Sequence, residues 1–129
     1  MKNRNGFFCM LIVLIFVCSA MPAWASTAYV TSTLSAQDGK VSIKVTTFGP
    51  GCYFNGSGNF ALEPGATASC SNTDWKGNTG SWQDVCVKPD RQWEGCPGPD
   101  WTSYPISRRY SNANITLKRS GCNIDVQIQ

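Results

Sequence analysis

"NITLKRSGCNIDVQIQ", residues 114–129, decides the fold class, because it has the pattern of two strands joined by a short turn. Ile124, Val126 and Ile128 alternate with polar residues, which is typical of a strand with one buried face. Residues 120–123, Ser-Gly-Cys-Asn, have the composition of a turn. The segment is therefore predicted to be a C-terminal β-hairpin.

The same alternation recurs upstream of this hairpin. Residues 29–48 are predicted to form another hairpin, closed by a type I′ turn at Asp38-Gly39. Further turns are expected at Asn55-Gly56 and Pro64-Gly65, and further strands at the segments 67–70 and 82–87. No segment has the apolar spacing of a buried helix face. The chain is predicted to be all-β, with six to eight short strands in a small, disulfide-stabilised antiparallel β-sandwich.

Residues 1–25 have the order of a secretory signal peptide. A short basic start precedes the apolar run 7–17, and "AWA" (23–25) is a small-x-small cleavage pattern. The apolar run is shorter than the roughly 20 residues that cross a bilayer. Cleavage is expected before Ser26, leaving a single domain over 26–129 without a transmembrane segment. The mature protein is therefore expected to be secreted or periplasmic.

The charge balance excludes one large class of partners. Of the 11 Lys and Arg residues, two lie in the predicted signal peptide, so the mature chain has nine basic against eight acidic residues. Nucleic-acid binding calls for a basic stripe or patch, and this near-neutral composition gives it no support.

The mature chain holds an odd number of cysteines, namely Cys52, Cys70, Cys86, Cys96 and Cys122. In an oxidising compartment they are all disulfide candidates, and at most two intrachain bridges can form, with one thiol left over. A bridge between Cys86 and Cys96 would stabilise the fold by about 3 kcal/mol and display Trp93 on a constrained loop. The spacing does not choose among the pairings.

Histidine is absent from the sequence, which removes Ser-His-Asp and Cys-His catalysis as well as imidazole zinc sites. No catalytic residue, metal site or cofactor is predicted. A carboxylate pair of the glycoside hydrolase kind is the enzymatic route that remains. Its candidates are acids that also suit solvated loops and turns: Asp74, Asp84, Glu94 and Asp100. The protein is expected not to be an enzyme.

Aromatic residues are concentrated in two segments, 71–83 and 90–105, that have loop composition. They are predicted to form the ligand-binding site: Trp75, Trp82, Trp93, Trp101 and Tyr104. Aromatic rings with polar neighbours suit a sugar face, a lipid headgroup boundary or a protein partner. The alternative is that Trp93 or Trp101 folds back and fills one end of the core.

The order of motifs in the second half resembles the aegerolysin family of small β-sandwich, lipid-binding proteins. That family has a Pro-Gly turn, then Ser-Cys-Gly, Gly-Thr-x-Gly and Trp-Asp-Cys-Pro-Trp segments. The corresponding segments are Pro64-Gly65, Ser69-Cys70, Gly77-Asn78-Thr79-Gly80 and Trp93-Glu94-Gly95-Cys96-Pro97. The chain departs from the family where Gly95 is inserted, where Gly98 replaces the second Trp, where no Gly follows Cys70, and in its signal peptide.

The resemblance implies binding to membrane lipids, with Trp93 and its neighbours near the lipid site. The function expected from the sequence is an exported binding protein that recognises a lipid or glycan surface through its aromatic loops, as a cytolysin-like component. The alternative is a secreted or periplasmic inhibitor or immunity protein that blocks a partner enzyme with a constrained loop.

Overall fold

The computed structural model describes residues 25–129, which form eight strands and no helix. The predicted signal peptide lies outside the described residues except for Ala25. No helix that could span a membrane occurs within 25–129. The strands are β1 (Thr27–Ser32), β2 (Val41–Thr47), β3 (Phe60–Leu62), β4 (Thr67–Ser71), β5 (Trp82–Pro89), β6 (Thr102–Pro105), β7 (Ala113–Ser120) and β8 (Asn123–Ile128).

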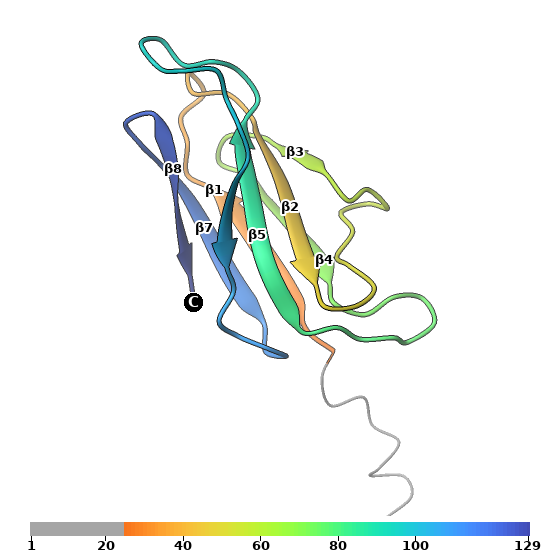
Figure 1. The fold of residues 1–129 in the computed structure, drawn as a ribbon. Helices are drawn as coiled ribbons and strands as arrows, with labels where there is room; N and C mark the ends of the chain where they lie inside the picture. Colours follow the sequence, from red (N-terminus) through yellow and green to blue (C-terminus); the bar gives the residue numbers. More distant parts are fainter. Residues whose placement is uncertain (1–24) are drawn as a thin grey trace, which may run out of the picture.

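Two four-stranded sheets pack face to face as a β-sandwich (Figure 1). One sheet has the order β4-β1-β7-β8 and the other the order β3-β2-β5-β6. Every strand pair is antiparallel except β1 with β7, which is parallel. The predicted all-β, disulfide-stabilised sandwich is thus confirmed, with one parallel pair added.

The core lies between the sheets and follows from the two-residue alternation of the strands. In β2, Val41, Ile43 and Val45 are buried, and in β7 Ile115 and Leu117 face them from the opposite sheet. Each square ångström of apolar surface removed from water contributes about 25 cal/mol. The alternating residues therefore fix which face of each strand is turned inward.

The C-terminal hairpin is confirmed, since β7 pairs with β8 from Ile115↔Ile128 to Ser120↔Asn123. The turn at Asn55-Gly56 is also confirmed, with positive φ values of 49° and 81°. It joins Phe54 and Ser57, whose backbone groups exchange two hydrogen bonds of 2.9 Å.

The predicted hairpin over residues 29–48 is wrong. β1 and β2 lie in different sheets, so the segment between them crosses the sandwich and closes no ladder. Gly39 has a φ of 81°, but Asp38 does not have the positive φ that a type I′ turn needs. Asp38 instead bonds Ser35 at its backbone and its carboxylate. β1 and β2 each have one apolar face. Because they lie in opposite sheets, both apolar faces are turned toward the core and are buried there.

Two disulfides join the sheets, Cys52–Cys70 and Cys96–Cys122, with Cα separations of 5.3 and 5.5 Å. Among the pairings that the sequence left open, the bridge between Cys86 and Cys96 is not formed. Cys86 lies in β5 with its side chain between the buried Val85 and Val87, so it points to the outer face, where Sγ lies 3.3 Å from Ser103 Oγ. Of the cysteines in the described part of the chain, Cys86 is the one left free.

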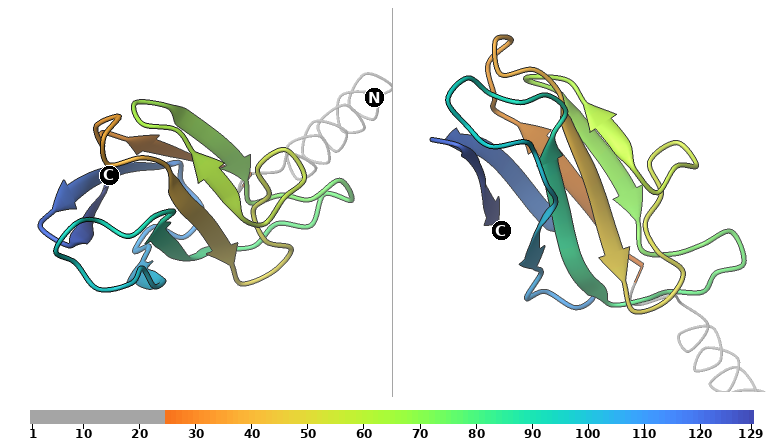
Figure 2. Two further views of the ribbon diagram at one scale, coloured as in Figure 1. Left: turned by 90° about the horizontal axis from the view of Figure 1, so that it is seen from above. Right: turned by 45° about the horizontal axis from the view of Figure 1, so that its top comes forward.

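The loops gather at two opposite ends of the sandwich (Figure 1), and Figure 2 shows the two sheets as separate layers between them. The Trp75 end is formed by the loops 48–59, 72–81 and 106–112. The Cys96 end is formed by the loops 33–40, 63–66 and 90–101 and the turn 121–122. The Cys52–Cys70 bridge lies toward the Trp75 end, and Cys96–Cys122 lies at the Cys96 end.

Candidate functional site

The predicted aromatic site is not assembled as one surface. Trp75 projects from the Trp75 end and is 89% exposed, whereas Trp101 lies in the loop of the Cys96 end and is 36% exposed. Trp82 and Trp93 are buried, and Tyr104 is partly buried against the core. The role of these five residues in ligand binding stays a prediction, but Trp75 and Trp101 alone among them present an exposed ring.

Trp93 follows the alternative in which its ring fills one end of the core, because it is buried and held by partners from two other segments. Its indole Nε1 donates a 2.8 Å hydrogen bond to the carbonyl oxygen of Asp38. The guanidinium of Arg119 lies over the ring, 4.2 Å from its centroid, and also bonds the Asp38 carboxylate at 2.6 Å. A Trp ring whose N–H finds an acceptor can be buried at little polar cost.

Trp82 and Tyr104 also serve the fold. Trp82 opens β5 and donates from Nε1 to the carbonyl oxygen of Ser111 at 2.9 Å. The hydroxyl of Tyr104 donates to the carbonyl oxygen of Ile124 at 2.7 Å and so connects the edge strands β6 and β8 of the two sheets. Trp82, which the sequence placed among the ligand-binding candidates, is therefore buried within the fold.

Trp101 rests against two lysines from the outer face of its sheet. The Nζ atoms of Lys44 and Lys88 lie 5.5 and 5.2 Å from the ring centroid. This double cation–π contact holds the ring on the surface of its own sheet, where such contacts contribute about 0.5–1 kcal/mol each. Trp101 is therefore exposed but already partnered.

The three most exposed aromatic side chains lie at the Trp75 end, and two of them are not among the predicted site residues. Phe48 is 69% exposed and Tyr53 is 56% exposed, and both join Trp75 there. Sequence reasoning missed Phe48 and Tyr53. A signal was present, because Tyr53 lies between the buried Cys52 and Phe54 and so takes the opposite face.

The loop 72–81 presents Trp75 at the tip of a tightly bonded turn. The Asp74 carboxylate accepts hydrogen bonds from the backbone N–H groups of Lys76 and Asn78, both at 2.9 Å, and from the Asn78 amide at 3.1 Å. Below the tip, the hydroxyls of Thr73 and Thr79 lie 2.9 Å apart. The indole is thus displayed by a preorganised loop, which lowers the ordering cost of binding.

The ionised carboxylate of Asp74 helps to hold this loop together. Desolvation raises the pKa of Asp74, but the hydrogen bonds from Asn78 and Lys76 together outweigh it, so the pKa lies below the usual 3.8. The carboxylate therefore stays ionised and bonded throughout the neutral and mildly acidic range.

Gly80 and Gly49 allow the loop 72–81 to pack closely against the loop 48–59. A Cβ added at Gly80 would lie 2.8 Å from Thr47 Oγ1 and 3.0 Å from the backbone nitrogen of Gly49. Phe48 also donates its backbone N–H to Ser81 at 2.9 Å. The loops that carry Phe48 and Trp75 are therefore packed backbone to backbone.

A hollow of about 460 Å³ lies between these loops. Tyr53 and Trp75 both line it, and Ser71, Thr73 and Asp74 supply its polar side chains. Two rings with hydroxyl and carboxylate groups between them can stack on an apolar face and hydrogen-bond its polar edge.

The Trp75 end is also basic. Its three loops contain Lys76, Arg108 and Arg109 against the single acid Asp74, and all three bases are exposed. Lys76 Nζ lies 5.1 Å from the centroid of the Trp75 ring. The end of the sandwich that carries the exposed rings therefore has an excess of positive charge.

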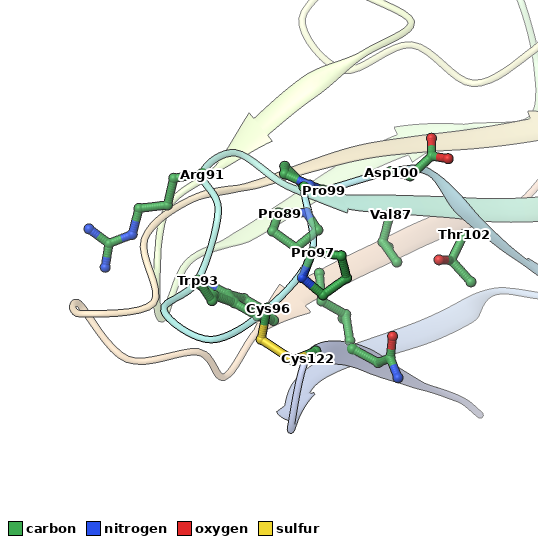
Figure 3. Close-up of a pocket in the computed structure, with 13 residues that line it drawn as sticks. Val87, Pro89, Arg91, Trp93, Cys96, Pro97, Pro99, Asp100, Thr102 and Cys122 are labelled. Carbon is green, nitrogen blue, oxygen red and sulfur yellow. A yellow bond between two sulfur atoms is a disulfide. The ribbon is translucent and has the colours of Figure 1, made fainter.

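Besides an open hollow of about 600 Å³ lined by Asp38, Trp93 and Arg119, the Cys96 end holds a pocket of about 160 Å³ (Figure 3). Trp93, Pro97 and the Cys96–Cys122 bridge line it, while Arg91 extends away from the other lining side chains. Pockets for small molecules usually measure about 300–1,000 Å³. This pocket is therefore too small for an ordinary small-molecule ligand.

The fold does not bring the four carboxylate candidates together at one place. Asp74 lies at the Trp75 end, Glu94 and Asp100 lie in the loop of the Cys96 end, and Asp84 lies in β5. Within residues 25–129, no three His, Cys, Asp or Glu side chains gather in a group that could hold a metal ion. The expectation that the protein is not an enzyme stays a prediction.

No family model matches the sequence, and no curated protein or solved structure is significantly similar to it. The resemblance to aegerolysins therefore stays a prediction that rests on the motifs alone. The two disulfides indicate that the chain folds in an oxidising compartment.

Proposed function

We propose that the protein is an exported binding protein that attaches to an anionic lipid surface through the Trp75 end. The observation that carries the proposal is the grouping of Phe48, Tyr53 and Trp75, the three most exposed rings among the described residues. Folding leaves these rings in water although other rings of the same chain are buried. Their exposure is therefore best explained by a surface that covers them.

The chemistry of the rings suits the boundary between lipid headgroups and acyl chains. Trp and Tyr favour this region because one side of the ring is apolar and the other carries a polar group, and Phe inserts more deeply. A ring that buries roughly 100 Å² contributes about 2.5 kcal/mol at 25 cal/mol per Å². Three rings at one end are enough for measurable membrane binding.

The charges of the Trp75 end act in the same direction. Lys76, Arg108 and Arg109 are exposed around the rings, and a basic residue near an anionic membrane contributes about 1 kcal/mol. This attraction weakens as salt is added, because the Debye length falls to about 8 Å at physiological ionic strength. The proposal therefore includes a preference for negatively charged lipids.

A glycan is the second candidate ligand, favoured by the hollow between Tyr53 and Trp75. Its polar lining groups, from Ser71, Thr73 and Asp74, match the hydroxyl-rich edge of a sugar ring whose faces stack on aromatic rings. Exposed Phe48 and the three bases are not needed for a neutral sugar, so the lipid surface accounts for more of the site.

The inhibitor alternative has less support. It relied on a short loop closed by Cys86 and Cys96, and Cys96 pairs with Cys122 instead. Trp93, which that loop was expected to display, is buried.

The test is sedimentation of the exported protein with phosphatidylcholine vesicles, with and without phosphatidylglycerol. Binding is expected to rise with the anionic lipid, and Trp75→Ala is expected to weaken it about tenfold or more. Trp101→Ala is the matched control, because it removes an exposed ring from the other end. Unchanged binding of Trp75→Ala, or binding to a glycan array and to neither vesicle, would overturn the lipid proposal.

A further inference from the structure

The geometry points to Asn72 as the docking site for a new amino terminus, the α-ammonium group that export processing creates at Ser26. The inference rests on the cleavage expected after Ala25. In that step water adds across the peptide bond, the Ala25 carbonyl becomes a carboxylate, and the Ser26 nitrogen becomes an amine that takes up a proton. Docking does not depend on what the Trp75 end binds.

Ser26 is already held by Asn72 through both of its backbone groups. Its nitrogen donates to Asn72 Oδ1 at 2.8 Å, and its carbonyl oxygen accepts from the backbone nitrogen of Asn72 at 3.1 Å. Asn72 is fully buried and Ser26 is 5% exposed, while the preceding Ala25 is exposed. The chain thus enters the fold at the residue where cleavage is expected.

A buried oxygen indicates that this site suits the cleaved chain better than the intact one. Within the described residues, Ser26 Oγ is buried and has no hydrogen-bond partner. Such an atom is costly as long as it is shut off from water. Cleavage removes the residue that precedes Ser26, which opens this corner to water and supplies extra N–H donors.

The new charge strengthens the existing contact. A peptide N–H gives Asn72 Oδ1 one neutral hydrogen bond, whereas an ammonium gives a charge-assisted bond, which is roughly twice as strong. A carboxamide oxygen is a suitable acceptor because it adds no second charge that must be buried.

Asn72 also closes the base of the loop that carries Trp75. Asn72 Nδ2 donates to the carbonyl oxygen of Gly80 at 3.1 Å, and the Gly80 nitrogen donates back to the carbonyl oxygen of Asn72 at 3.1 Å. The same residue therefore seats the amino terminus and closes the base of loop 72–81. Processing is expected to tighten the base of this loop.

The experiment compares two exported proteins: the natural chain, and a chain with Gly-Ser inserted between Ala25 and Ser26. Intact mass first verifies that each is cleaved after Ala25. The insertion moves the ammonium away from Asn72, so the folding equilibrium constant from urea unfolding is expected to fall about tenfold. In an Asn72→Ala background the insertion is expected to have no further effect.

A second measurement keeps the inference testable if Asn72→Ala does not fold. The α-amine of the docked Ser26 is expected to be acylated at neutral pH about tenfold more slowly than the inserted Gly, because a bonded ammonium gives up its proton reluctantly. Equal acylation rates and equal stability of the two exported proteins would overturn the inference. A natural chain that starts elsewhere than Ser26 would overturn its premise. Vesicle binding is scored separately, so failure of the lipid proposal leaves this result unaffected.

Discussion

At the Cys96 end, Trp93 lies beneath the guanidinium of Arg119 and bonds the backbone of Asp38, whereas at the Trp75 end the indole of Trp75 is 89% exposed. Both rings come from loops of similar composition. The difference lies in what surrounds them: Trp93 meets an acceptor in the loop 33–40 and a cation on β7, whereas the turn that carries Trp75 is held by hydrogen bonds from Lys76 and Asn78 to Asp74 within its own loop. A constrained aromatic loop can therefore close a core or serve as a binding surface, and tertiary partners decide which.

Alanine substitutions of Trp93 and of Trp75 are expected to give the largest difference in unfolding free energy between the two ends. Trp93→Ala is expected to destabilise the fold by about 3–5 kcal/mol, as for a large ring removed from a core. Trp75→Ala is expected to stay within about 0.5 kcal/mol, since it removes an exposed side chain. Urea midpoints of the two variants measure this, and a large loss for Trp75→Ala would mean that its ring supports the fold.

Breaking either disulfide tests whether the two ends stabilise the same domain. Each bridge crosses between the sheets, at sequence separations of 18 and 26, so its loss is expected to cost about 3 kcal/mol. The comparison uses the double variants Cys52→Ser/Cys70→Ser and Cys96→Ser/Cys122→Ser. Thiol labelling of the denatured, non-reduced natural protein should find one free thiol, and two or more would contradict the pairing.

Gly80→Ala tests whether the loops of the Trp75 end are packed together. The added methyl group would lie 2.8 Å from Thr47 Oγ1 and 3.0 Å from the Gly49 nitrogen, so a cost of about 1–3 kcal/mol is expected. Gly98→Ala in the loop of the Cys96 end is the control, because nothing lies within 4 Å of its added Cβ. Equal unfolding midpoints for both variants would show that the two loops move apart easily.

Arg119→Met tests the ion pair of the Cys96 end, with an expected loss of roughly 1–2 kcal/mol at neutral pH. The Arg119 hydrogen bond is the main cause that lowers the pKa of Asp38 below 3.8, although desolvation opposes it. A carboxyl whose pKa is lowered by folding stabilises the fold above its unfolded pKa and loses this as pH falls through the folded pKa. The stability difference should therefore hold down to about pH 4 and shrink below it, and a difference that grows in acid would contradict this assignment.

Two local features of the fold were predictable from sequence, whereas the hairpin expected over residues 29–48 was wrong and the pairing of distant residues was not predictable. The β7–β8 hairpin and the Asn55-Gly56 turn are set by alternation and turn chemistry within a few residues. The β1–β7 parallel pair joins segments far apart in the chain, and no local pattern marks it. The same holds for the choice of Cys122 over Cys86 as the partner of Cys96.

The candidate site shows the same limit. The sequence named both Trp75 and Trp93 as site candidates, but it could not show that Trp93 meets Asp38, 55 residues away in the chain. The sequence does not mark Phe48 as a site residue, because it directly follows a strand and lies at the end of the hairpin expected over residues 29–48. The packing of its loop against the loop 72–81, through Gly49 and Gly80, joins segments about 30 residues apart and has no local sequence signal.

The central claim is that the rings of the Trp75 end meet a lipid surface while those of the Cys96 end stay in the protein. Tryptophan fluorescence in anionic vesicles that carry brominated acyl chains tests it directly, because bromine quenches only rings that enter the bilayer. The account predicts quenching and a blue shift in the natural protein, and in Trp101→Ala, that disappear in Trp75→Ala. Quenching that persists in Trp75→Ala, or none in the natural protein at saturating lipid, would contradict it.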